Sequence, residues 1–190
     1  MGHPVTNDPR AVPDIVRKTL PDGKELIIRG VQPKDLVALA DIYVKVYTAF
    51  DVGETWTQKS ALQMLKDLDT RDHSVSVLAE VDGKIVGGAF ADSKSWEGKR
   101  VMEAKEIFVD PEYQQRGIGT ELAKERLHRA EVWHGVTEAE LVTFADKGHA
   151  RSWHESMGYK PTEGLQMMHG KVSVIKNNLS KASLGSEAKE

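Results

Sequence analysis

The chain has 190 residues, of which 39% are hydrophobic and 29% are charged, a composition typical of one soluble globular domain with its own core. Its net charge of -3 provides no basic excess for neutralising phosphates, which argues against nucleic acid as the main partner. The absence of cysteine excludes disulfides, thiolate metal sites and a cysteine nucleophile.

The sequence shows no pattern of a targeting signal or of a membrane-spanning segment. Residues 1–14 lack the apolar run of a secretory signal, and no stretch reaches membrane-spanning length. We therefore expect a cytoplasmic protein without membrane contact. We divide it into an extension over residues 1–23, a single domain over 24–177 and a polar tail over 178–190.

Apolar residues recur at strand spacing in some segments of the domain and at helix spacing in others. Strands are expected at residues 24–31, on both sides of the turn within 73–90, at 100–109, at 138–145 and, as one or two strands, within 165–177. Helices are expected at residues 33–50, 58–71, 118–133 and 147–157. This order predicts an α/β fold with a mixed sheet and helices on its faces.

Local signals mark several of these boundaries. Asp82-Gly83 predicts a type I′ turn between two strands. Thr55 followed by Gln58 has the pattern of a capping box before the second helix. Asp146 is a candidate cap for the last helix, and Gly158 stands where a left-handed residue usually ends one.

Residues 113–122, YQQRGIGTEL, place two glycines between a predicted strand and a predicted helix. The P-loop pattern fails, because Thr120 and not lysine follows the second glycine. The dinucleotide pattern also fails, because Leu122 occupies the position that needs a small residue for close helix packing. The pattern that remains is Q-x-x-G-x-G.

A helix that starts at this loop would offer unpaired N–H groups and a partial positive charge to an anion. Glycines let the backbone approach that anion, and Arg116 adds charge at the rim, so a pyrophosphate would fit. The alternative is a tight turn before an ordinary surface helix. On that helix we expect Glu121, Glu125 and Arg129 to face water.

Residues 106–122, EIFVDPEYQQRGIGTEL, resemble motif A of the GNAT superfamily, the GCN5-related N-acetyltransferases. The matching positions are Val109, Pro111, Tyr113, Gln114, Gly117 and Gly119. Downstream, residues 150–159, ARSWHESMGY, resemble the family's A-x-x-F-Y-E-K-L-G-F segment. The order of elements is similar to that of the family from Leu26 to Lys176.

The resemblance implies a GNAT-like fold, with a mostly antiparallel sheet, a splayed parallel pair of strands and helices on both faces. It also implies acetyl-CoA as co-substrate and no metal. The loop amides would hold its pyrophosphate, and the preceding strand would pair with pantetheine. The implied cofactor-binding residues are Ile107, Phe108, Val109, Gln114, Gln115, Arg116, Gly117, Ile118, Gly119 and Thr120.

Transfer of acetyl to an amine requires a base, and the strand before the loop offers Glu103 and Glu106. Strand alternation places these two side chains on opposite faces unless a bulge intervenes. Glu103 is preferred, because it lies eleven residues before Gln114, a spacing similar to that of histone-acetylating members of the family. The alternative is that both are solvated strand residues.

The general acid is the point at which this sequence departs from the family. His154 stands where the resemblance leads one to expect tyrosine, and histidine can donate a proton near neutral pH. Tyr159 or a water could protonate the sulfur instead, which would leave His154 as a surface residue. The histidines of the chain show no metal-ligand spacing.

The acceptor pocket is expected between the first two helices. Phe50, Asp51, Glu54 and Trp56 lie there, and carboxylates beside aromatic faces suit a protonated amine. The alternative is that the aromatic residues pack the helix ends while the acids face water.

These features predict an acetyl-CoA-dependent N-acetyltransferase that transfers acetyl directly to a primary amine of a small molecule. One alternative is acetylation of a protein N-terminus or lysine. Another is an acyl-CoA-binding module without catalytic activity. A homodimer is possible through pairing of the C-terminal strands.

Overall fold

The computed structural model describes residues 15–50, 53–145 and 148–186. The chain forms two compact units, residues 1–144 and 145–190, and each is described by itself. In the described part of the chain, no helix has both the length and the apolar character needed to cross a membrane.

The first unit contains the sheet and the helices that pack on it. Its strands are β1 (Val16–Thr19), β2 (Glu25–Gly30), β3 (Val77–Val81), β4 (Lys84–Trp96), β5 (Lys99–Val109) and β6 (Glu138–Leu141). Its helices are α1 (Leu36–Phe50), α2 (Gln58–Arg71) and α3 (Ile118–His134), with short 3-10 helices at Pro33–Asp35, His73–Val75 and Pro111–Tyr113. The second unit contains α4 (Gly148–Ser156) and α5 (Val172–Ser186).

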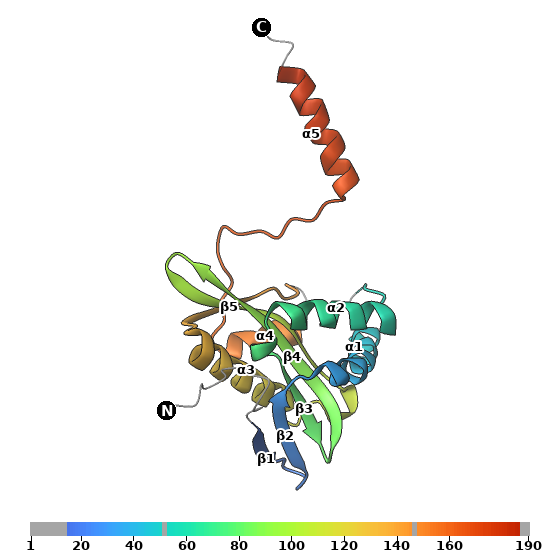
Figure 1. The fold of residues 1–190 in the computed structure, drawn as a ribbon, viewed down its shortest axis with the longest axis vertical. Helices are drawn as coiled ribbons and strands as arrows, with labels where there is room; N and C mark the ends of the chain where they lie inside the picture. The colour runs from blue at the N-terminus through green and yellow to red at the C-terminus, as the bar shows by residue number, and fades with distance from the viewer. Residues whose placement is uncertain (1–14, 51–52, 146–147, 187–190) are drawn as a thin grey trace, which may run out of the picture. The chain divides into compact units, whose positions relative to one another are not determined.

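The six strands lie in sequence order, β1-β2-β3-β4-β5-β6, and form one sheet. Figure 1 labels the first five of them. All neighbours pair antiparallel except β5 and β6, which are parallel. This arrangement confirms the predicted mixed α/β sheet with one parallel pair. β1 belongs to the segment interpreted as an extension, and its pairing with β2 continues the sheet back to Val16.

Helices cover the two faces of this sheet, with α1 and α2 on one side and α3 on the other (Figure 1). The α1/α2 side is filled by a cluster that includes Leu39, Tyr43, Leu65, Phe90 and Phe108. The α3 side is filled by a cluster that includes Ile28, Ala79, Val109, Ile118 and Leu122. Strand alternation explains this division, because neighbours such as Phe108 and Val109 point to opposite faces.

The middle of β5 contains a β-bulge. Phe90 of β4 pairs with Glu106, whereas the next residue, Ala91, pairs with Ala104, so Lys105 is the extra residue on β5. In the described chain, β6 pairs with β5 only through Val101–Ala104. The last part of β5 therefore continues beside β4 after β6 has ended. The splay expected between the parallel strands stays a prediction.

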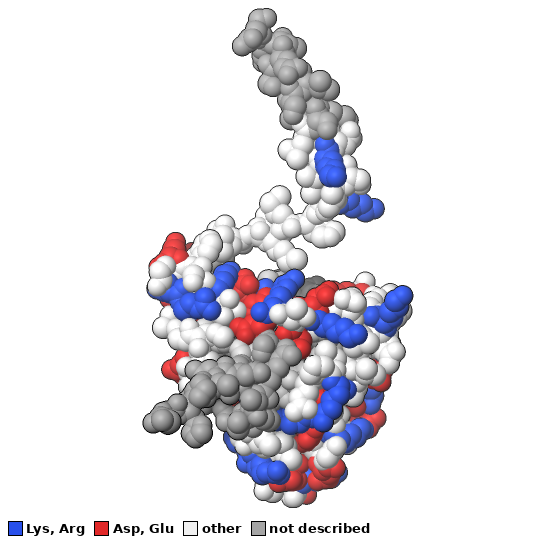
Figure 2. All heavy atoms as spheres, viewed as in Figure 1, with Lys and Arg blue, Asp and Glu red and all other residues white. Residues whose placement is uncertain are grey.

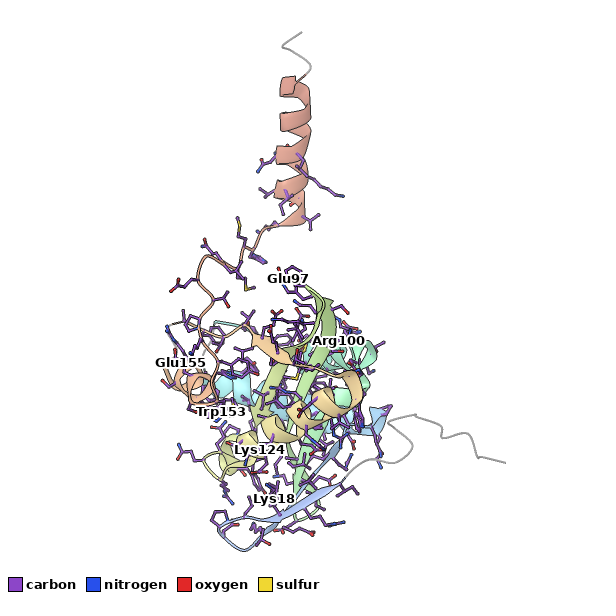
Figure 3. All side chains as sticks on the ribbon, turned by 90° about the vertical axis from the view of Figure 1, so that its left-hand side faces the viewer. Lys18, Glu97, Arg100, Lys124, Trp153 and Glu155 are labelled. Carbon is purple, nitrogen blue, oxygen red and sulfur yellow. The ribbon has the colours of Figure 1, made fainter. Side chains whose placement is uncertain are left out.

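Two positive-φ turns flank β4. Asp82 and Gly83, with φ of 50° and 78°, connect β3 to β4 and confirm the predicted type I′ turn. Glu97 and Gly98, with φ of 47° and 77°, form a turn of the same kind, which places Glu97 at the tip of the β4–β5 hairpin (Figure 3).

The predicted cap of α2 was wrong by two residues. Thr57, not Thr55, precedes the helix, and its Oγ1 accepts from the Ser60 N–H at 3.1 Å. The Ser60 side chain bonds back to the Thr57 N–H, so serine takes the role given to Gln58. Gly158 has a φ of +99° after α4, as predicted, and Asp146 lies outside the described residues.

The prediction of strands within residues 165–177 was wrong, because α5 starts at Val172. The apparent alternation covers only Val172 to Val174, while Ile175 and Leu179 continue at helical spacing. The expected buried strand over residues 138–145 is also shorter than predicted. β6 ends at Leu141, its residues are partly exposed, and the Val142 side chain is 76% exposed.

The outward direction predicted for two residues of α3 was wrong as well. Glu125 and Arg129 are buried, with the Arg129 Nε donating to the Glu125 carboxylate at 2.8 Å. The Arg129 guanidinium also lies 5.0 Å from the centre of the Trp133 ring. The two charges can be buried because they pair with each other. A helical pattern that assigns charged residues to the solvent face therefore places these two residues on the wrong side of the helix.

Glu121, one turn earlier, is partly buried and pairs with Lys18 of β1 and with Lys124, both labelled in Figure 3. On the face shown in Figure 2, the acidic and basic side chains of the first unit are interspersed.

Candidate active site

The predicted anion loop joins the end of β5 to the start of α3. The Gln114 side chain donates to the Val109 carbonyl at 2.9 Å, which fixes the loop to the strand. Gln115 and Gly117 have positive φ angles of 61° and 82°. Gly117 is the N-cap residue of α3, and a Cβ built there would meet no atom within 4 Å.

The geometry of this loop fits a pyrophosphate. Gly117 provides no side-chain cap, and the first intrahelical bond at this end runs from the Glu121 N–H to the Gly117 carbonyl. The N–H groups of Ile118, Gly119 and Thr120 therefore remain for an anion at the positive end of the helix. The buried Ile118 side chain points into the core, so at this residue only the backbone faces the ligand.

The other residues assigned to the cofactor lie around this loop. Arg116 is at its rim, where the guanidinium bonds Asp22 at 2.8 Å and lies 5.2 Å from the centre of the Tyr113 ring. Ile107, Phe108 and Val109 form the end of β5, beyond its pairing with β6. The backbone of these three residues pairs with β4 on one side. The opposite side is the one on which pantetheine is expected.

Glu106 lies at the bulge of β5 and reaches the α1/α2 face of the sheet. Its Oε2 accepts a 2.8 Å hydrogen bond from the Tyr47 hydroxyl. Burial raises the pKa of Glu106 to about 6, opposed by the hydrogen bonds from Tyr47 and Tyr43 and assisted by the negative charge of Glu54. A carboxyl group in this range can both accept and release a proton near neutral pH.

Aromatic rings surround this carboxylate on the α1 side. Tyr43 and Tyr47 stack with ring centres 4.3 Å apart, and Trp56 meets Tyr43 edge-on at 5.1 Å. The Trp56 Nε1 donates to Glu54 at 2.7 Å. Aromatic faces beside two carboxylates form an environment that favours a cationic group.

Glu103 has a different environment. It bonds the Nζ atoms of Lys94 at 2.7 Å and Lys105 at 2.8 Å. The hydrogen bond from Lys105, followed by that from Lys94, lowers the pKa of Glu103 to about 2. Glu103 also lines an open, polar cavity of about 470 Å³ with Arg71 and Asp92. As a carboxylate held by two ammonium groups, it is a weak proton acceptor at neutral pH.

The bulge changes the predicted relation between these two glutamates. Glu106 pairs with Phe90 and Glu103 pairs with Asp92, and these partners are two residues apart on β4. The two carboxylates therefore lie on the same face of the sheet, not on opposite faces. Both glutamates face the helices that cover that side.

The four residues predicted for the acceptor pocket are only partly brought together. Trp56 and Glu54 lie near Glu106, as described above. Phe50 is the last residue of α1, and its side chain is 49% exposed. Asp51 lies outside the described residues.

The two predicted acids lie together in the second unit. The His154 and Tyr159 rings are 5.8 Å apart and nearly perpendicular, and the Tyr159 N–H bonds the His154 carbonyl at 3.3 Å. Their assignment as proton donors stays a prediction.

The sequence interpretation gave Tyr43 and Tyr47 no role at the site. Their spacing of four residues on a buried helix face was a usable signal. Buried tyrosine hydroxyls need polar partners, and the strand that packs against this helix carries a glutamate. The spacing together with that requirement pointed to a Tyr–Glu pair.

Comparison with known proteins agrees with this geometry. Residues 36–159 match the family described as the acetyltransferase (GNAT) family. The chain belongs to the GNAT family. The matched range contains β5, the glycine loop, α3 and the segment with His154.

Two relatives of this GNAT chain are uncharacterised archaeal N-acetyltransferases. The protein from Methanocaldococcus jannaschii is 37% identical over 133 residues, which cover 64% of this chain and 58% of the relative. The protein from Archaeoglobus fulgidus is 31% identical over 122 residues, covering 58% and 82%. The chain thus spans less than two thirds of the length of the first relative.

A solved structure shows the same fold. An aminoglycoside N-acetyltransferase in complex with CoA superposes with a TM-score of 0.62 and 20% identity, and the match covers 80% of this GNAT chain and 99% of the other.

Proposed function

We propose that the protein is an acetyl-CoA-dependent N-acetyltransferase that acetylates the primary amine of a small molecule. The observation that carries this proposal is the construction of β5. Its end leads into a loop of free helix amides, and Glu106 in its middle projects a half-buried carboxylate beside aromatic rings. An anionic cofactor and a cationic acceptor would thus be held by one strand.

In this proposal Glu106, rather than Glu103, is the general base. The acceptor nitrogen loses a proton to the Glu106 carboxylate and attacks the thioester carbon. A C–N bond forms and the C–S bond breaks, the attacking nitrogen loses its second proton to water, and the thiolate takes a proton from an acid. We assign that acid to His154, with Tyr159 as the alternative. Direct transfer agrees with a sequence that contains no cysteine to carry the acetyl group.

The aromatic wall supports a small amine as acceptor. A protonated amine between Trp56 and Glu106 would gain cation–π and ion-pair interactions before it loses its proton. The CoA-bound aminoglycoside N-acetyltransferase shows that this fold can accommodate CoA. Because its identity to this chain is only 20%, the similarity is evidence for the fold alone.

The test is acetyl-CoA-dependent thiol release, measured with a thiol reagent across small amines and short peptides. The protein gives no background signal, because it has no cysteine. Turnover with one class of small amine would support the proposal. Turnover with peptides alone would indicate a protein acceptor. If acetyl-CoA binds by calorimetry but no acceptor reacts, the protein is a binding module and the proposal is wrong.

A further inference from the structure

Arg126 is a buried charged residue on the helix that follows the cofactor loop. It lies in α3, its exposed fraction is 2%, and it is among the largest fully buried side chains of the described chain. Apolar residues such as Leu122 and Ala130 occupy the same buried side of the helix. Burying a guanidinium among them costs desolvation energy that an aliphatic residue would avoid. The position therefore calls for a specific explanation.

The contacts of Arg126 lie at the bulge of the sheet. Its Nη1 donates to the Phe90 carbonyl of β4 at 3.3 Å and to the Glu106 carbonyl of β5 at 3.1 Å. These two residues pair with each other immediately beside the extra residue Lys105. A bulge interrupts the regular ladder, and buried carbonyls near it need other donors. A charged guanidinium supplies strong ones.

Glu106 is consequently held from both sides of the sheet. Its backbone carbonyl accepts from Arg126 of α3, and its side chain accepts from Tyr47 of α1. The pairing of β5 with β6 has ended two residues earlier, at Ala104, so β6 does not hold this part of the strand. Without the guanidinium, the backbone at Glu106 would be held by β4 on one edge only.

We propose that Arg126 is a positioning residue, whose guanidinium fixes the β5 bulge in the conformation that directs Glu106 toward α1. Its significance for catalysis rests on the proposed function, in which Glu106 is the base. The backbone conformation at Glu106 and the environment of its carboxylate do not depend on any acceptor.

The test compares Arg126→Met and Arg126→Lys with Arg129→Met. Arg129 is a matched control, because it is equally buried on α3 but pairs with Glu125. Each protein is labelled with ¹³C at the glutamate carboxyls, and Glu106→Gln assigns the Glu106 resonance. Its titration by NMR reports the pKa of Glu106 in the free protein, and hydrogen exchange reports the amides of residues 105–109.

In the parent protein the Glu106 carboxyl should titrate near pH 6. In Arg126→Met we expect water to enter the bulge, the midpoint to fall by about one pH unit and the exchange of residues 105–109 to accelerate roughly tenfold. Arg126→Lys should give a smaller change, since an ammonium reaches two carbonyls less well than a guanidinium. Arg129→Met leaves the buried Glu125 without its ion pair and should lower the stability of the whole core. It should nevertheless retain the parent midpoint of Glu106, and its exchange at residues 105–109 should accelerate no more than in the rest of the sheet.

An unchanged midpoint and unchanged exchange in folded Arg126→Met would overturn the inference. Equal changes in Arg129→Met would also overturn it, because the effect would then be general loosening. If neither Arg126 variant folds, the residue serves the whole core and not the base. The proposed function can fail separately, since the thiol-release assay can show no acceptor while the titration still gives its result.

Discussion

The Tyr47 hydroxyl donates a 2.8 Å hydrogen bond to the Glu106 carboxylate, joining the first helix to the strand that leads into the cofactor loop. Because α1 packs on the sheet through Tyr43 and Phe108, this bond has a rigid support on both sides. The helix that borders the expected acceptor pocket therefore also adjusts the proton affinity of the proposed base.

Replacement of Glu106 by glutamine should separate catalysis from cofactor binding. We expect kcat/KM to fall by roughly 10²- to 10⁴-fold, the range for loss of a general base, with the Kd for acetyl-CoA unchanged. Glu103→Gln is the matched control on the same face and should change kcat/KM by less than about threefold. Steady-state kinetics and calorimetry measure both quantities. The reverse order of effects would make Glu103 the base.

The pH dependence of the reaction should follow Glu106. The rate kcat/KM should rise through about pH 6, where the carboxyl loses its proton. Tyr47→Phe keeps the ring but removes a hydrogen bond that lowers this pKa, so the acidic limb should move to higher pH by about one unit. A profile that does not move would mean that another group controls the limb.

Glu106 should also affect the pH dependence of stability. Its pKa is raised from 4.5 to about 6, so the folded protein binds this proton more tightly than the unfolded chain does. The parent should therefore lose stability between about pH 4.5 and pH 6 relative to Glu106→Gln. The difference in unfolding free energy between the two proteins should change by up to about 2 kcal/mol from pH 4 to pH 7. Urea denaturation at several pH values measures it.

Gly117→Ala should weaken acetyl-CoA binding. A residue with a Cβ is strained at a φ of 82°, and the new methyl group would stand at the amides that face the anion. We expect Kd to rise roughly tenfold, a loss of about 1.4 kcal/mol. Gly135→Ala provides the control, because Gly135 caps the other end of α3 at a φ of 63° with similarly open surroundings. Gly135→Ala should lower Tm about as much as Gly117→Ala does, because both positions have a positive φ, but it should bind acetyl-CoA with the parent Kd.

The corrected cap of α2 gives a direct stability test. Thr57→Ala removes the acceptor for the Ser60 N–H and should cost about 1 kcal/mol. Thr55→Ala, two residues earlier on the exposed surface, should change stability by less than about 0.5 kcal/mol. Chemical denaturation of the two variants would show which threonine caps the helix.

Patterns confined to short segments predicted much of the molecule. The Asp82-Gly83 turn depends on two adjacent residues, and the glycine loop depends on a strand, a turn and a helix in succession. Their conformations follow from local backbone preferences, so the order of the central strands and helices was accessible. The α/β class was predicted correctly for the same reason.

Features that depend on contacts between distant parts of the chain could not be predicted from the sequence. The bulge at Lys105 arises where β4, β5 and α3 meet. The sequence has no glycine at that position of β5, so it lacks a residue that often indicates a bulge. The burial of Glu125 and Arg129 depends on their pairing, which a polarity pattern treats as exposure. Glu103 and Glu106 could not be ranked as bases until the lysines and tyrosines around them were known.

The turns at Asp82-Gly83 and Glu97-Gly98 have a consequence for the order in which the molecule assembles. They make β3, β4 and β5 a meander, in which each strand pairs with the next strand along the chain. Hairpins of this kind form within microseconds. The parallel pairing of β5 with β6 must wait until α3 has crossed the sheet, and such long-range closure is slow. During synthesis, we therefore expect the strand that carries Glu106 to form before the helix that supplies Arg126 and the amides proposed to bind the anion.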